Sequence, residues 1–169
     1  MPNMEYLISE DATKLDLDLI HKFLSEDSYW ARGIPREVVA RSIANSLCFG
    51  VYALENANPD SDWRQVGFAR VSTDRATFAY LADVFILPEH RGRGLSKRLM
   101  EAVLAHPDLQ GLRRWMLATA DAHELYRRFG FAELSQPDRF MQRHDPDVYG
   151  RCGNVVRREP WSAASLARP

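Results

Sequence analysis

Residues 80–104, YLADVFILPEHRGRGLSKRLMEAVL, decide the fold. The apolar run from Ala82 to Leu87 predicts a buried strand, which a proline ends. A turn of alternating arginine and glycine, residues 91–94, follows it, and apolar side chains then recur at helical spacing. The N–H groups at a helix start have no partner within the helix, and the helix dipole is positive there. We therefore expect a strand–turn–helix unit that binds a phosphate, with Arg91 and Arg93 adding charge-assisted contacts.

The composition is that of one ordinary soluble domain. The chain has 169 residues, of which 46% are hydrophobic and 27% charged, and a net charge of −1. We assign residues 1–150 to a single domain and residues 151–169 to a C-terminal tail that is poorly ordered or loosely docked. The near-neutral charge disfavours nucleic-acid and membrane partners. Without a signal peptide pattern or a membrane-spanning run, the sequence predicts a cytoplasmic protein. We expect a monomer or a homodimer.

The two cysteines, Cys48 and Cys152, lie far apart and match no metal-ligand spacing. Free thiols in a reducing compartment are the default interpretation, and a disulfide stays open. We predict no metal site.

Periodicity and turn residues predict the order β-α-α-β-β-β-α-β-α-β-β, an α+β sheet with helices on its faces. Asp121 and Glu124 form a capping-box pattern before the last helix, and Gly130 ends that helix. Strands are expected at 4–9, 47–54, 65–73, 77–87, 112–118, 131–134 and 139–142, and helices at 15–24, after Pro35, after Gly94 and after Asp121.

Two motifs resemble those of the GNAT superfamily of N-acetyltransferases. Arg91-Gly92-Arg93-Gly94-Leu95-Ser96 is similar to its acetyl-CoA pyrophosphate loop, R/Q-x-x-G-x-G/A. Leu125-Tyr126-Arg127-Arg128-Phe129-Gly130-Phe131 is similar to its second hallmark, a helical tyrosine followed by a Gly-Phe turn. The resemblance covers residues 4–144 in element order. It departs at Ser96, where the family usually has Gly or Ala.

The resemblance implies a GNAT-like mixed, mostly antiparallel central sheet with helices on both faces. It also implies acetyl-CoA as co-substrate, with the backbone of the central strand pairing with the pantetheine arm and the loop holding the pyrophosphate. The implied cofactor-binding residues are Phe85, Ile86, Leu87, Arg91, Gly92, Arg93, Gly94, Leu95 and Ser96.

For catalysis, the resemblance makes Tyr126 the general acid that assists the leaving thiolate. The alternative is that Tyr126 is a core aromatic beside Phe129. Asp83 is the candidate base, because a carboxylate in an apolar strand is costly unless it faces a cleft or has a partner. A structural carboxylate, with a water chain as the base, is an equal alternative. His123 is a further proton acceptor or, by the simpler interpretation, a surface histidine.

The segment between the first two helices usually lines the acceptor pocket in this family, which implies Tyr29, Trp30 and Arg32 as substrate-binding residues. Arg127, Arg128, Lys97 and Arg98 either reach coenzyme A phosphates or form a solvated face. The predicted function is transfer of an acetyl group from acetyl-CoA to a primary amine of a small molecule or peptide, by direct attack in a ternary complex. The alternatives are a transferase for a larger acyl group and a non-catalytic coenzyme A-binding module.

Overall fold

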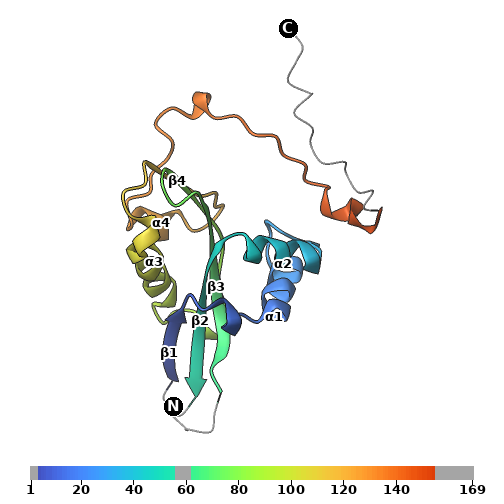
Figure 1. The fold of residues 1–169 in the computed structure, drawn as a ribbon, viewed down its shortest axis with the longest axis vertical. Coiled ribbons are helices and arrows are strands. Elements are labelled where there is room, and N and C mark those ends of the chain that lie inside the picture. The colour runs from blue at the N-terminus through green and yellow to red at the C-terminus, as the bar shows by residue number, and fades with distance from the viewer. Residues whose placement is uncertain (1–3, 56–61, 155–169) are drawn as a thin grey trace.

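The computed structural model describes residues 4–55 and 62–154 (Figure 1). Five strands form one sheet in the order β1-β2-β3-β4-β5. The first three pairings are antiparallel, and β4 pairs with β5 in parallel, which confirms the predicted mixed, mostly antiparallel sheet. The strands are β1 (Met4–Ser9), β2 (Leu47–Glu55), β3 (Arg64–Thr73), β4 (Phe78–Ile86) and β5 (Arg114–Met116).

Helices cover both faces of the sheet, as predicted (Figure 1). One core packs under α1 (Leu17–Lys22) and α2 (Arg36–Ala44), and the other lies between the sheet and α3 (Leu95–Ala105), with α4 (His123–Arg127) beside it. Short 3₁₀ segments are Ala12–Lys14, Pro88–His90, Pro107–Leu109, Pro137–Arg139 and Tyr149–Asn154. No helix within the described residues is both long and apolar enough to cross a membrane.

The first helix differs from its predicted range. It begins at Leu17 because the Asp16 side chain accepts a hydrogen bond from the Leu19 N–H at 3.0 Å. It continues past Lys22 as a π turn, Phe23–Asp27. Phe23 is buried there and stacks on Phe85 of β4, with ring centroids 3.9 Å apart, so the turn fixes the loop that follows it to the sheet.

A bulge in β4 decides how its side chains are distributed. Phe68 pairs with Phe85 but Arg70 pairs with Ala82, so two residues of β4 oppose one of β3. Within the bulge Asp83 has a φ of +55°, a left-handed conformation that aspartate tolerates. As a result, Leu81 packs in the core under α3, whereas Phe85, an even number of residues later, packs in the core under α1 and α2.

Three predictions at the C-terminal end of the sheet were wrong. β5 is shorter than the predicted 112–118, and neither 131–134 nor 139–142 forms a strand. Pro137 has no N–H and opens a 3₁₀ turn, and Met141 is 98% exposed, so no buried face holds this segment on the sheet. It leaves the sheet as an extended arm (orange in Figure 1). Most of the tail predicted at 151–169 lies outside the described residues.

Candidate active site

β4 and β5 pair over only three positions and then separate. Phe78, Ala79 and Tyr80 pair with Arg114, Trp115 and Met116. Beyond that point, no strand among the described residues pairs with this edge of β4. An open strand edge can accept an extended ligand through main-chain hydrogen bonds. Of the three predicted backbone partners, Leu87 is already engaged, since its N–H donates to the Val66 carbonyl at 2.8 Å and its carbonyl accepts from the His90 N–H at 3.0 Å.

The glycine turn after β4 opens the start of α3 to solvent. Gly92 and Gly94 have φ values of +72° and +73°, the left-handed region that glycine adopts without strain. Gly94 is the N-cap of α3, so no side chain caps the first N–H groups of this helix. An uncapped helix start behind a glycine turn is a suitable anion site.

The basic side chains near this turn divide into two groups. Arg91 donates from Nε to the Ile86 carbonyl at 2.9 Å, which fixes the turn to the end of β4, and Arg98 donates to the Tyr6 carbonyl at 3.0 Å. Lys97 lies 3.8 Å from Glu101. Arg93 is exposed and has no ion-pair or hydrogen-bond partner among the described residues, so it is the cation best able to meet a ligand phosphate.

A cavity of about 350 Å³ opens beside the β4–β5 separation. It is bounded by the loop between the π turn and α2, by β4 and by the loop between β5 and α4. Of the five residues predicted for catalysis or substrate binding, four line it: Tyr29, Trp30, Asp83 and Tyr126. Arg32, the fifth, is exposed on the same loop and does not line the cavity.

Hydrogen bonds fix the walls of this cavity. The Trp30 indole Nε1 donates to Asp83 Oδ1 at 3.1 Å, and Arg70 Nε donates to Asp83 Oδ2 at 2.7 Å. Across the cavity the Tyr29 hydroxyl accepts from the Ala120 N–H at 2.8 Å. The loop carrying Tyr29 and Trp30 is therefore attached at two points, to β4 and to the β5–α4 loop.

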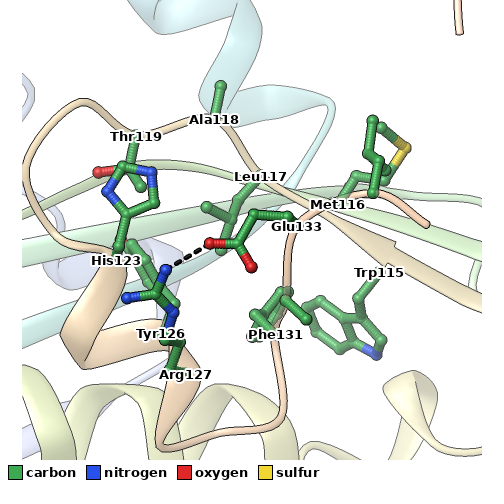
Figure 2. A pocket seen from close by; sticks show the side chains of 12 residues that line it. Trp115, Met116, Leu117, Ala118, Thr119, His123, Tyr126, Arg127, Phe131 and Glu133 are labelled. Atoms are coloured by element: carbon green, nitrogen blue, oxygen red, sulfur yellow. Dashed lines mark hydrogen bonds and ion pairs between the residues drawn. The ribbon is translucent and has the colours of Figure 1, made fainter. Parts of the chain in front are cut away.

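Tyr126 of α4 lines this cavity and also a second one of about 300 Å³, whose lining side chains are shown in Figure 2. It is 8% exposed, and its ring contacts Phe131 edge-on at 6.0 Å. Burial, and then the proximity of Tyr29 and Asp121, raise its pKa to about 12. Its hydroxyl has no hydrogen-bond partner among the described residues. The ring is thus part of the core, as the simpler interpretation held, and also lines the cavity.

Two other residues of α4, His123 and Arg127, line the second cavity. Arg127 forms ion pairs with Glu124, at 2.6 Å, and with Glu133, the latter drawn in Figure 2. It is therefore occupied by protein carboxylates. His123 lines this cavity as an exposed side chain, and Arg128 is exposed outside it.

Sequence reasoning missed two charged residues of the first cavity. Arg70 stands in the apolar stretch VGFARV of β3, and a charge in a buried strand was the signal that could have identified it. Asp121 was expected to cap α4, but the N-cap is Ala122 and it makes no side-chain bond. The Thr119 hydroxyl accepts from the Ala122 N–H at 3.0 Å, and the Asp121 carboxylate, which lines the cavity, makes no hydrogen bond or ion pair among the described residues.

Within the described part of the chain, no group of three or more His, Cys, Asp or Glu side chains is arranged to hold a metal ion. The charged side chains that line the two cavities are those already described.

Comparisons with known proteins agree with this geometry. Residues 50–133 match the acetyltransferase (GNAT) domain family. A protein of Gibberella zeae named as an acetyltransferase is 36% identical over 72% of this chain and 76% of its own length. A GNAT-family crystal structure from Xanthomonas campestris pv. campestris is 55% identical, with a TM-score of 0.79, over 86% of this chain and 96% of that chain.

A distant likeness concerns the fold alone. N-acetylglutamate synthase from Neisseria gonorrhoeae, complexed with coenzyme A and N-acetyl-glutamate, has a TM-score of 0.60 at 18% identity, over 80% of this chain and 30% of that chain. Family match, identity and coverage together lead to one conclusion: the chain belongs to the GNAT family of acetyltransferases.

Proposed function

We propose that this acetyltransferase moves an acetyl group from acetyl-CoA to a primary amine by direct attack in a ternary complex. The observation that carries the proposal is the position of Tyr126. It is buried in the wall of the first cavity, which residues 80–84 of β4 also line, next to the strand edge that β5 leaves open. The cavity is suited to an acceptor, the strand edge to a pantetheine arm, and the helix start to a pyrophosphate.

Acetyl-CoA, the acyl donor, would be bound by main-chain groups more than by arginine side chains. Phe85 and Ile86 would pair with the pantetheine arm, although the Ile86 carbonyl already accepts from Arg91, while Leu87 ends the edge because both of its main-chain groups have partners. The N–H groups after Gly94 and the free Arg93 side chain would hold the pyrophosphate. Ser96 is half-buried in the first turn of α3, and its hydroxyl can donate to a phosphate.

Acetyl-CoA supplies the thioester, and the chain's residues place and assist the transfer. The acceptor ammonium first loses one proton. Its nitrogen lone pair then forms a bond to the carbonyl carbon, the C–S bond breaks, and that electron pair goes to sulfur. The nitrogen loses a second proton and the thiolate gains one, so each turnover gives an amide, a thiol and one net proton.

Tyr126 would act on the thiolate. A phenol whose pKa is about 12 remains protonated at any physiological pH, so it is always available as a donor. The same raised pKa makes it a weak acid, which favours a strong hydrogen bond to the thiolate over complete proton transfer. Solvent then completes the protonation.

Asp83 would position the cavity walls, and water would remove the protons from the amine. Both carboxylate oxygens of Asp83 already accept hydrogen bonds, one from Trp30 and one from Arg70. Protonation would weaken both bonds at once, which opposes a role as base. Between the two alternatives, a base or a structural carboxylate, these contacts favour the second.

Tyr126→Phe tests the proposal. We expect kcat for amine acetylation to fall about 100-fold, because a donor to the leaving group is lost, with little change in the KM for acetyl-CoA. Tyr52→Phe is the matched control, since Tyr52 is 3% exposed, its hydroxyl also lacks a partner among the described residues, and it lines neither cavity. Wild-type kcat in Tyr126→Phe, or acetyl-CoA binding without transfer to any amine, would overturn the proposal.

A further inference from the structure

The charge balance of the acceptor cavity is simple. Among the described residues, three charged side chains line it: Arg70, Asp83 and Asp121. Two of them neutralise each other, since Arg70 and Asp83 form an ion pair with side-chain exposures of 18% and 10%. One negative charge therefore remains.

The Arg70–Asp83 pair has few hydrogen-bonding groups left for a ligand. Arg70 also donates from Nη1 to the hydroxyls of Ser46 and Ser72, each at 3.2 Å, and Asp83 also accepts from Trp30. A ligand carboxylate or phosphate at Arg70 would have to compete with this network and would face the Asp83 charge at close range. The cavity offers an anion no other cation among the described residues.

Asp121 is different. No side chain caps α4, and the Asp121 carboxylate accepts no hydrogen bond and forms no ion pair among the described residues. Its charge is one cause of the raised pKa of Tyr126, so it lies near the phenol. Asp121 is therefore the one carboxylate of the cavity without a partner among the described residues, and it lies at the end of the cavity where the reaction would occur.

The rest of the wall is aromatic and the space is small. Rings come from Tyr29, Trp30, Tyr80, Tyr126 and Tyr149, and the volume of about 350 Å³ is at the low end for ligand cavities. Aromatic rings favour an apolar body and attract a cation through their faces.

Building on the proposed function, we propose that the acceptor is a compact primary amine with one positive charge, no anionic group and an apolar or aromatic body, whose ammonium Asp121 receives. Amino acids and sugar phosphates are disfavoured because no unpaired cation lines the described part of the cavity to bind their carboxylate or phosphate group. Polyamines are disfavoured because their second ammonium finds no second free carboxylate.

Two matched substrate pairs test the charge requirement at saturating acetyl-CoA. 2-Phenylethylamine and L-phenylalanine differ by one carboxylate, and pentylamine and cadaverine differ by one amine. We expect kcat/KM to be at least about tenfold higher for the first member of each pair, because the second carries a charge that the cavity leaves unpaired. A preference for phenylalanine or cadaverine would overturn the inference.

Asp121→Asn tests the named residue. We expect the KM for 2-phenylethylamine to rise about five- to tenfold while the KM for acetyl-CoA stays constant, since Asp121 would touch only the amine. Asp62→Asn, an exposed aspartate before β3 and outside both cavities, is the control and should match wild type. An unchanged amine KM in Asp121→Asn would refute its role.

The outcomes separate the two proposals. Acetylation of amines with the charge preference reversed would remove this inference and leave the proposed function intact. Stabilisation by acetyl-CoA in a thermal-shift assay, without acetylation of any amine in the panel, would remove both.

Discussion

Arg70 on β3 and Asp83 on the β4 bulge form an ion pair with Nε 2.7 Å from Oδ2. The Asp83 side chain is 10% exposed, so removing its partner would leave a buried charge whose one remaining donor among the described residues is Trp30. We expect Arg70→Met to lower the free energy of unfolding by about 2–3 kcal/mol. Adding Asp83→Asn should recover part of that loss, because asparagine tolerates the left-handed backbone and carries no charge. Urea unfolding measures both variants, and wild-type stability in Arg70→Met would contradict the argument.

Gly94 should matter for both stability and acetyl-CoA binding. Gly94 and Gly111 have φ values of +73° and +70°, and an added Cβ would meet open space at either position. We therefore expect alanine at each to cost about 1 kcal/mol of stability through backbone strain. Only Gly94→Ala should also raise the KM for acetyl-CoA, because only Gly94 opens the helix start. Equal KM values for the two variants would argue against a phosphate site there.

Asp74 should stabilise the β3–β4 turn in a pH-dependent way. The Thr77 hydroxyl and the N–H groups of Thr77, Ala76 and Phe78 donate to its carboxylate and hold its pKa well below the usual range. A depressed folded-state pKa gives stability that is present above the unfolded pKa of about 4 and is lost as the pH falls toward the folded value. The Tm difference between wild type and Asp74→Ala should therefore be constant near neutral pH and shrink below about pH 4. A difference that does not change with pH would contradict this.

The Cys48 thiol should be unreactive in the folded protein. Burial raises its pKa to about 11, with a smaller contribution from Asp83, while Arg70 acts in the opposite direction. A rise of about two pH units reduces the thiolate fraction about 100-fold. With Cys152 replaced by serine, alkylation of Cys48 by iodoacetamide at pH 8 should be at least about 100-fold slower in native protein than in urea. Equal rates would show that the thiol is accessible.

Much of the sheet and of the anion site could be predicted, because the signals are local. The apolar run of β4, the two turn glycines and the buried face of α3 each depend on residues within one helix turn or one strand. The strands expected at 131–134 and 139–142 failed for the opposite reason. Their alternation was weak, and a strand exists only where another strand and a buried face hold it.

Four residues of the first cavity could be selected from the sequence, but their contacts could not. The sequence indicates Asp83 because it is a charged residue in an apolar strand. Whether it is a base or a structural carboxylate depends on its contacts with Arg70 and Trp30, which lie 13 and 53 residues away in the chain. Asp121 is expected from the sequence to cap α4, but no side chain caps that helix. No local sequence pattern reveals which of two carboxylates will accept a hydrogen bond from a donor far away in the chain.

In residues 80–104, the sequence by itself determined the strand, the glycine turn and the helix. It did so because backbone conformation and helical periodicity are set by near neighbours. Only the tertiary structure decided the acceptor cavity. Its walls come from the segment before α2, from β4 and from the β5–α4 loop, and its net charge depends on which side chains pair across those distances. That pairing is a property of packing, and packing exists only once the chain has folded.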